Sequence, residues 1–178
     1  KDVEYDLSVV IPTYNRPNIL RKALKSLKQD MCGLKVEIIV ADTAPCCFSE
    51  SVIANIFLDC ALDNIKYFQN ENNIGMFGNW NRCIELASAT WIAMLHDDDI
   101  VSDDYFLKIK KILKKLYKQP DVVYVRANAG YIIGDKKQEY NGLKNFLNKR
   151  AAGKILVFGS KDLDYIGPER IGLFGISS

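Results

Sequence analysis

The sequence predicts an α/β protein, a doubly wound and mostly parallel sheet flanked by helices, in a single domain. Two observations predict this class: short apolar runs rich in Val and Ile alternate with helical patterns, and those patterns are amphipathic. The length of 178 residues suits one domain with a substantial core. The sequence shows no internal repeat, low-complexity tract or second domain.

The first half of the chain supplies three predicted strands. Residues 7–14 (LSVVIPTY), 36–44 (VEIIVADTA) and 65–71 (IKYFQNE) are short apolar runs bounded by polar turn residues. Between them, residues 18–30 predict a helix with its apolar side chains on one face, and residues 49–59 predict a second helix.

The second half continues the alternation and then loses it. Residues 76–88 predict a helix, 90–97 (TWIAMLHD) a fourth strand, 103–119 a strongly amphipathic helix, and 122–133 a further strand. After about residue 134 the chain is polar and favours a loop, in which KILVFGS predicts one more strand.

Composition excludes several classes of protein. A hydrophobic content of 48%, a charged content of 26% and a net charge of +2 are ordinary for a soluble domain and give no basic field for nucleic acid. No apolar run has the length of a membrane span, and no signal-peptide pattern is present. Five cysteines without a CxxC pair, and a single histidine, predict reduced packing thiols in a cytoplasmic protein.

Polar residues follow four of the predicted strands. In doubly wound sheets, ligands bind beyond the carboxyl ends of the strands, near the point where strand order reverses. The residues at those ends are Pro12, Thr13, Tyr14, Asn15 and Arg16, then Asp42 and Thr43, then Asn72, Asn73, Ile74 and Gly75, and finally His96, Asp97, Asp98 and Asp99. The sequence therefore predicts one polar edge that holds the site.

The three consecutive aspartates favour a divalent cation. Two carboxylates about 4 Å apart repel by roughly 4 kcal/mol at an effective dielectric of ~20. Mg²⁺ or Mn²⁺ relieves such repulsion through one or two carboxylates, with water and substrate phosphates completing its shell. The alternative is structural: Asp99, Asp103 or Ser102 caps the next helix. A cap uses one residue, so most of the triplet is left for the metal.

The first strand end also admits two interpretations. Structurally, Pro12 ends the strand ladder, Pro17 suits the first helical turn and Asn15 caps that helix. Functionally, Tyr14 stacks on a base and Arg16 binds a phosphate. Asp42 is likewise either a turn residue or an acceptor for a base N–H.

Four stretches together resemble the family 2 glycosyltransferases, inverting enzymes of the GT-A fold that use nucleotide-diphospho-sugars. They are LSVVIPTYNRPNILRKALKSL, VEIIVAD, NENNIGMFGNWNRCIELA and ATWIAMLHDDDIV, in the expected order over roughly residues 6–105. The resemblance implies a GT-A domain over residues 1–178, with 6–105 as the nucleotide-sugar-binding half and 106–178 as the start of an acceptor-side portion.

The resemblance also implies roles for individual residues. The nucleotide-sugar-binding set is Pro12, Thr13, Tyr14, Asn15, Arg16, Asp42, Asn73, Gly75, Asn81 and Asp97. Within it, Asp42 matches the acid that reads the base, usually uracil, and Asp97 lies where ribose or sugar is approached. Asp98, in the DXD region, matches the ligand of a divalent metal, Mn²⁺ or Mg²⁺, that bridges the diphosphate. Asp99 matches either a supporting acid or the helix cap.

The chain departs from the family pattern at two places. Thr43-Ala44-Pro45 stands where the family commonly has Asp-Gly-Ser, which weakens the assignment of uracil as the base. His96 stands where the family often has an aspartate, and we interpret it as a buried neutral imidazole, because hard ions prefer oxygen ligands.

The catalytic base is the least determined part of the site. An inverting transfer needs a group that takes the proton from the acceptor hydroxyl. In the family this is a downstream Asp or Glu, and only Asp162, Asp164 and Glu169 come late enough here. None has a convincing context, so we expect the base beyond residue 178, in a longer transferase of which this chain is the donor-binding portion.

The expected partners are a nucleotide-diphospho-sugar donor and a saccharide or lipid-linked acceptor of polysaccharide biosynthesis. The six lysines between residues 108 and 118 predict a solvated helix face or, as an alternative, peripheral contact with anionic lipid at the inner face of the membrane. Two other functions stay open: a nucleotidyltransferase-like enzyme and a non-catalytic nucleotide-sugar-binding module.

Overall fold

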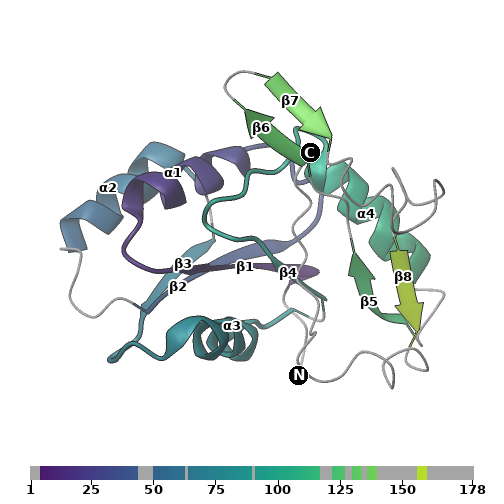
Figure 1. The fold of residues 1–178 in the computed structure, drawn as a ribbon. Coiled ribbons are helices and arrows are strands. Elements are labelled where there is room, and N and C mark those ends of the chain that lie inside the picture. Colours follow the sequence, from purple (N-terminus) through teal and green to yellow (C-terminus); the bar gives the residue numbers. More distant parts are fainter. Residues whose placement is uncertain are drawn as a thin grey trace.

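The computed structural model describes residues 5–43, 50–62, 64–89 and 91–116, together with four short strands from 122 onward. Its centre is a parallel sheet of four strands in the order β3-β2-β1-β4 (Figure 1). The strands are β1 (Leu7–Thr13), β2 (Val36–Asp42), β3 (Ile65–Gln69) and β4 (Trp91–Met94). The sheet confirms the predicted doubly wound, mostly parallel α/β class.

Four helices pack on this sheet. They are α1 (Pro17–Ser26), α2 (Glu50–Cys60), α3 (Gly75–Leu86) and α4 (Tyr105–Leu116). Each overlaps a helix predicted from the apolar periodicity, with ends that differ by up to four residues. No described helix is both long and apolar enough to cross a bilayer.

The later strands pair differently from the first four. β5 (Val122–Arg126) is antiparallel to β8 (Leu156–Gly159), and β6 (Gly130–Ile133) is antiparallel to β7 (Lys136–Glu139). The single strand expected over 122–133 was therefore wrong, because this segment contributes to two separate two-stranded sheets. The strand predicted in KILVFGS is confirmed as β8.

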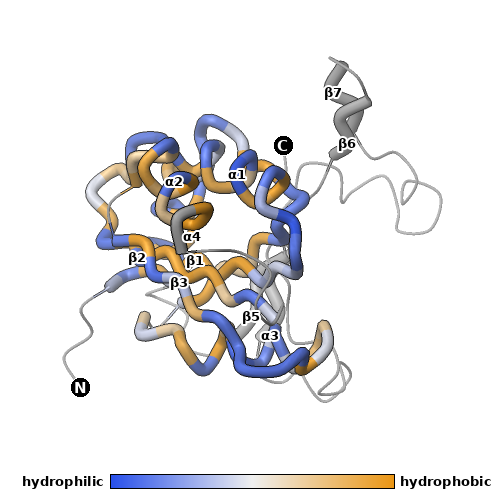
Figure 2. Tube along the Cα trace, turned by 90° about the vertical axis from the view of Figure 1, so that its left-hand side faces the viewer, coloured by the Kyte–Doolittle hydropathy of each residue, from blue (hydrophilic) through white to orange (hydrophobic). Residues whose placement is uncertain are grey.

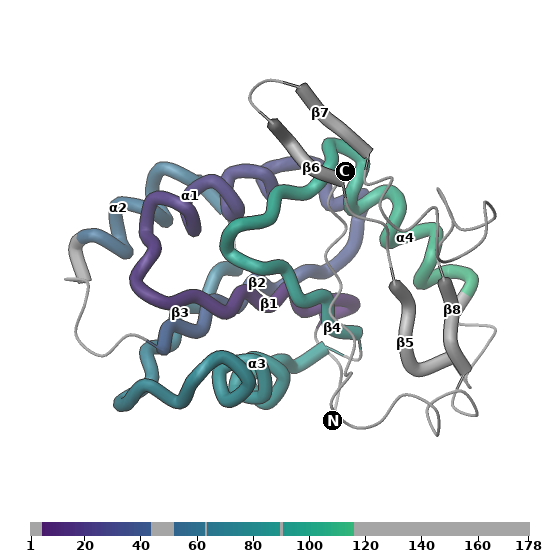
Figure 3. The backbone as a smooth tube through the Cα atoms, viewed as in Figure 1, coloured from purple at the N-terminus to yellow at the C-terminus, as the bar shows by residue number. Residues whose placement is uncertain are grey.

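Alternate residues of each strand pack on opposite faces of the sheet. Val9, Ile38 and Ala93 lie in a core with α1, α2 and α4, whereas Val10 and Ile39 lie in a second core with α3. Figure 3 shows the same layers, with α1 and α2 on one side of the strands and α3 on the other. Successive side chains of a strand point to opposite faces, so a sheet covered on both sides needs continuous apolar runs.

The two central strands are buried along their whole length. Every residue of β1 and β2 is buried, whereas β3, at one edge of the sheet, has partly exposed residues throughout. Figure 2 shows these central strands as mostly apolar segments. Burial of each Val, Leu or Ile side chain contributes about 1.5–3 kcal/mol, so these strands supply much of the folding free energy.

A charged group is buried at the amino-terminal edge of the sheet. Glu37, in β2, has no exposed surface. Its carboxylate accepts hydrogen bonds from the Ser8 hydroxyl at 2.6 Å and from the main-chain N–H and hydroxyl of Ser88 at 2.7 and 2.6 Å. The Lys66 ammonium lies 2.9 Å away. Paired in this way, the carboxylate joins three neighbouring strands at the edge opposite the predicted site.

Strand order reverses between β1 and β4. From β1 the chain adds β2 and β3 on one side, and it then returns to place β4 on the other side of β1. In doubly wound sheets, this reversal opens a crevice beyond the carboxyl ends of the two strands. Thr13 ends β1 and Asp97 follows β4, so the fold brings the first and fourth predicted polar segments together.

Candidate functional site

The loop after β1 turns sharply before α1. Asn15 has a φ of 53°, in the left-handed region that asparagine tolerates better than most residues. Arg16 is the residue immediately before α1 and makes no side-chain cap, while Pro17 occupies the first helical turn as expected. The expectation that Asn15 caps the helix was wrong, since its backbone makes the turn that places Arg16 at the sheet edge.

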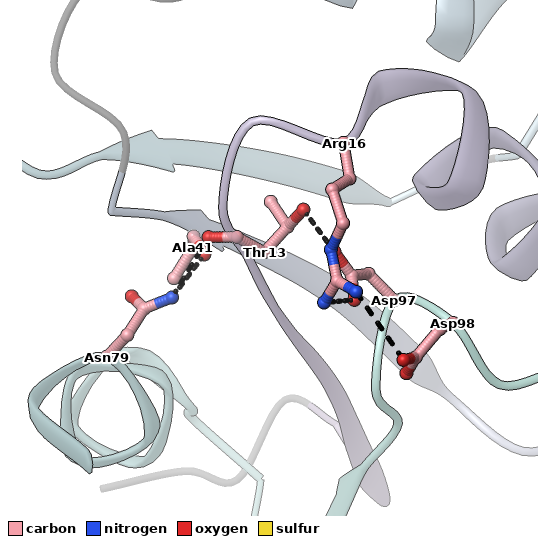
Figure 4. A network of polar contacts seen from close by, with 6 residues as sticks. All are labelled: Thr13, Arg16, Ala41, Asn79, Asp97 and Asp98. Carbon is pink, nitrogen blue, oxygen red and sulfur yellow. Dashed lines mark hydrogen bonds and ion pairs between the residues drawn. The ribbon is translucent and has the colours of Figure 1, made fainter. Parts of the chain in front are cut away.

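Arg16 and Thr13 both contact Asp97, from the opposite side of the strand-order reversal (Figure 4). The Thr13 hydroxyl donates to Asp97 Oδ2 at 2.6 Å, and Arg16 Nε donates to the same oxygen at 3.0 Å. Arg16 Nη2 pairs with Asp97 Oδ1, and Nη1 reaches Asp98 Oδ2 at 3.5 Å. One guanidinium therefore bridges two consecutive aspartates.

The two aspartates differ in exposure. The Asp97 side chain is 1% exposed, whereas that of Asp98 is 58% exposed. Burial raises the pKa of Asp97, and the Thr13 hydrogen bond and the Arg16 charge oppose that rise. Burial also raises the pKa of Asp99, and the nearby His96 opposes this rise. Arg16 thus supplies the charge that makes a buried Asp97 carboxylate tolerable.

Asp98 has the chemistry of a ligand for a hard cation. Its carboxylate is exposed beyond the carboxyl end of β4, and its 3.5 Å contact with Arg16 is long for a hydrogen bond. Within the described residues, no three His, Cys, Asp or Glu side chains converge as a preformed metal site. A carboxylate of this kind fits an ion that takes one or two protein oxygens and completes its shell with water and phosphate.

The turn after β4 accounts for the remaining acids. The Asp99 N–H donates to the His96 carbonyl at 3.1 Å, which closes a turn through Asp97 and Asp98. Asp99 lies six residues before α4 and is too early in the chain to cap it. The residue just before α4 is Asp104, which accepts from the Ser102 hydroxyl at 2.7 Å. None of the residues expected to cap α4, namely Asp99, Asp103 and Ser102, stands directly before the helix.

Asp42 lies directly beside Thr13 in the sheet. The two residues are partners in the parallel register of β1 and β2, so Pro12 does not end the ladder as expected. The Asp42 side chain is buried, and the Tyr67 hydroxyl donates to its Oδ2 at 3.0 Å. This contact comes from β3, and sequence reasoning missed Tyr67.

The segment between β3 and α3 is attached to the end of β2. The Ile74 N–H donates to the Thr43 hydroxyl at 3.0 Å. The Gly75 N–H donates to Asn73 Oδ1 at 2.9 Å, and Gly75 has a φ of 72° that favours glycine. Asn73 and Gly75, both predicted to bind nucleotide-sugar, are exposed on this segment.

Asn79 is a residue of this edge that sequence reasoning missed. Its side-chain amide donates to the carbonyls of Ala41 at 2.8 Å and Thr13 at 3.3 Å, and it accepts from Asn70 at 2.9 Å. It is 2% exposed, whereas the predicted Asn81 is exposed. Helical spacing offered a signal: Asn79 lies four residues before the buried Cys83 and shares its face.

Aromatic rings lie on α3 next to the turn after β4. The ring of Trp80 meets His96 edge-on at 5.4 Å and Phe77 at 5.2 Å. His96 is thus a half-buried ring packed against an indole. Tyr14 is 49% exposed on the loop after β1, which leaves its ring accessible to a ligand.

Several predicted features lie outside the described residues. They are Ala44 and Pro45, the late loop over residues 134–153, apart from the short segment of β7, and the late acids Asp162, Asp164 and Glu169.

The parallel sheet, the strand-order reversal and the acidic turn beyond it define a GT-A-type glycosyltransferase domain. The family described as "Glycosyl transferase family 2" matches residues 8–172. The chain belongs to this family, as the four quoted stretches predicted.

A curated relative from Campylobacter jejuni is 43% identical over 95 residues, which are 52% of this chain and 29% of the relative. It is named GalNAc(5)-diNAcBac-PP-undecaprenol beta-1,3-glucosyltransferase. The chain therefore spans less than a third of that relative's length.

Two solved structures share the fold. S. aureus TarS 1-349, in complex with UDP-GlcNAc, aligns with a TM-score of 0.54 at 22% identity over 74% of this chain and 36% of the other. Mannosyltransferase PcManGT from Pyrobaculum calidifontis, in complex with GDP-Man and Mn²⁺, aligns with a TM-score of 0.57 at 17% identity over 73% and 37%. At these identities the likeness establishes the GT-A fold.

Proposed function

We propose that this chain binds the donor in an inverting, metal-dependent glycosyltransferase that moves a sugar from a nucleotide-diphospho-sugar, a UDP-sugar, to a saccharide or lipid-linked acceptor. The observation that carries the proposal is the bridge from Arg16 to Asp97 and Asp98 at the strand-order reversal of a family 2 chain. This edge of the sheet combines a cation, a buried acid and an exposed acid, which are the groups needed to hold a diphosphate and its metal.

The donor would lie along the carboxyl ends of β1, β2 and β4. The exposed ring of Tyr14 offers a face for the base, and Asp42, held by Tyr67, offers an acceptor for a base N–H. Arg16 is close enough to the acidic turn to bind a phosphate of the donor there. Asn73, Gly75 and Asn81 are exposed along α3 and the segment before it, where the nucleotide would lie.

Asp98 would hold a divalent cation, Mn²⁺ or Mg²⁺. When bound, such an ion offsets the negative charge that develops on the departing nucleoside diphosphate. Asp97 accepts hydrogen bonds from Arg16 and Thr13, and would so hold these two side chains in place for the donor. The acceptor hydroxyl attacks the anomeric carbon from the side opposite the diphosphate, which inverts the configuration at that carbon. The base that takes its proton stays a prediction, placed beyond the described residues.

A lipid-linked acceptor is the more specific form of this proposal. The Campylobacter jejuni relative is named for an undecaprenol-linked acceptor. On this chain, α4 buries Tyr105, Phe106 and Ile109 and exposes a row of lysines. Two of these, Lys108 and Lys110, already contact Asp104 and the Cys32 carbonyl, which favours a largely solvated face. Sedimentation with anionic vesicles at low and at high salt tests the membrane contact.

The central test measures nucleotide binding with and without metal. Isothermal titration of UDP in the presence of Mn²⁺ should show binding that is lost without Mn²⁺ and lost in Asp98→Asn. Asp103→Asn, which removes an exposed carboxylate before α4, is the matched control and should bind like the parent chain. Equal affinity in Asp98→Asn would remove Asp98 from the metal site.

The two competing functions give different results. A non-catalytic nucleotide-sugar-binding module binds nucleotide-sugars but forms no product from them, and a module used only to hold a partner shows no metal-dependent shift in melting temperature against a panel of nucleotide-sugars. A nucleotidyltransferase-like enzyme binds them but cleaves the diphosphate, so product analysis would reveal a nucleoside monophosphate and a sugar phosphate. A glycosyltransferase releases the nucleoside diphosphate instead.

A further inference from the structure

Arg16 engages the acids to which a metal and a donor are expected to bind. Both oxygens of Asp97 are occupied, Oδ2 by Thr13 and Arg16 Nε and Oδ1 by Arg16 Nη2. The same guanidinium also lies 3.5 Å from Asp98 Oδ2. The acidic pair is thus neutralised in part by an internal cation.

This geometry opposes the binding of a metal ion by itself. A divalent ion at Asp98 would lie within a few ångströms of the guanidinium, and like charges at that separation repel even in a high dielectric. The ion would also have to loosen the contact between Arg16 and Asp98. Asp97 is a poor additional ligand for this ion, because its oxygens already accept hydrogen bonds from Arg16 and Thr13.

A diphosphate changes this balance. Guanidinium groups bind phosphate oxygens through paired hydrogen bonds as well as they bind carboxylates. The Arg16 side chain is 44% exposed and lies in the loop before α1, so it can turn toward a new partner without disturbing the core. Once it pairs with phosphate, its repulsion toward an ion at Asp98 is offset by the phosphate charge.

We propose that Arg16 is an exchangeable internal cation: it neutralises Asp97 and Asp98 when the donor is absent and transfers its Asp98 contact to the diphosphate when the donor binds. This rests on the proposed donor and metal binding. The exchange makes metal and diphosphate binding cooperative, because each removes the obstacle to the other.

The first experiment compares Arg16→Gln with the parent chain. Free Mn²⁺ is measured by electron paramagnetic resonance during titration, with and without saturating UDP. Arg16→Gln should bind Mn²⁺ alone about tenfold more tightly, since one repelling charge is gone. The factor by which UDP strengthens Mn²⁺ binding should fall by about the same ratio.

Arg21→Gln is the matched control. Arg21 lies on α1 and pairs with Asp59 at 2.9 Å, away from the acidic turn, so its loss removes the same charge from the chain. Its Mn²⁺ affinities should equal those of the parent chain.

A second experiment observes Arg16 directly in the parent chain, and a variant serves only to assign the signal. Arg16 donates to Asp97 through Nε–H and reaches Asp98 through Nη1, so nitrogen-labelled protein should show a protected Nε–H resonance and a separate Nη resonance. Addition of Mg²⁺ alone should leave the Nη resonance in place, whereas Mg²⁺ with UDP should shift it. Arg16→Lys assigns the signal.

The outcomes separate the inference from the proposed function. Metal-dependent UDP binding with an unmoved Arg16 Nη resonance, or with no gain in Mn²⁺ affinity in Arg16→Gln, overturns the exchange and leaves the function intact. A parent chain that binds no UDP with any metal overturns both.

Discussion

The side-chain amide of Asn79 donates a hydrogen bond to the main-chain carbonyl of Thr13, whose hydroxyl contacts Asp97. The same amide donates to Ala41, so one buried side chain of α3 connects the ends of β1 and β2. Asn79→Ala removes three hydrogen bonds, although the Thr13 carbonyl still accepts from the Thr43 N–H at 3.1 Å, and we expect a loss of about 1–3 kcal/mol in the free energy of unfolding. Urea denaturation measures it.

Asn81→Ala is the companion to this change. Asn81 is exposed and lies two residues further along α3, so its loss should alter the free energy of unfolding by less than about 0.5 kcal/mol. Loss of its predicted nucleotide contact should nevertheless weaken UDP binding. A stable Asn81→Ala variant with unchanged UDP affinity would remove that residue from the donor site.

Tyr14 tests the placement of the base. The ring is 49% exposed, so Tyr14→Ala should cost little stability. Stacking of a base on an aromatic ring contributes about 1–3 kcal/mol, so UDP affinity should fall roughly tenfold. Tyr14→Phe keeps the ring and should retain most of the affinity. Calorimetry with both variants separates stacking from a hydroxyl contact, and equal affinity in all three proteins would place the base elsewhere.

Sequence reasoning predicted the sheet well because its signals were local. Continuous apolar runs such as those of β1 and β2 occur where a sheet is covered on both faces, and the alternation with amphipathic helices implied parallel order. The late strands lacked such signals: β7 (Lys136–Glu139) reads KKQE and is wholly polar. Its pairing with β6 depends on the neighbouring strand and not on its own composition.

The site was predictable in its acids but not in their contacts. The carboxyl ends of the strands pointed to Thr13, Arg16 and Asp97, which the fold does bring together. Repulsion between aspartates indicated a cation, but sequence spacing does not reveal that Arg16, more than eighty residues away, is the one that contacts them. Asn79 was missed although it shares a helical face with Cys83, because an asparagine within a helix matches no binding motif.

Burial also controls which thiols react. Cys83 is fully buried, and desolvation raises its pKa to about 12, whereas Cys32 is partly exposed. Alkylation of the folded chain at pH 8 should therefore modify Cys32 at least about tenfold faster than Cys83, since the thiolate is the reactive form. Peptide mass spectrometry measures both sites. Fast modification of Cys83 without denaturant would mean that α3 does not pack on the sheet as described.

Glu37 gives the stability of the chain a defined dependence on pH. Burial alone raises its pKa, but hydrogen bonds from Ser8, Ser88 and Lys66 outweigh that effect and lower the pKa to about 2, from an ordinary value of 4.5. A carboxyl with a lowered pKa stabilises the folded state fully above its unfolded value. That stabilisation is then lost as the pH falls from about 4.5 toward 2.

The expected loss across that interval is at most about 3 kcal/mol, because the Lys66 ammonium is 45% exposed and partly screened. Glu37→Gln should be less stable than the parent at pH 7, and the difference should shrink as the pH approaches 3. Glu85→Gln, which breaks an exposed pair with Arg82, is the matched control and should follow the parent. Urea denaturation at several pH values decides, and a constant difference between Glu37→Gln and the parent would show that the carboxylate is not held by these three partners.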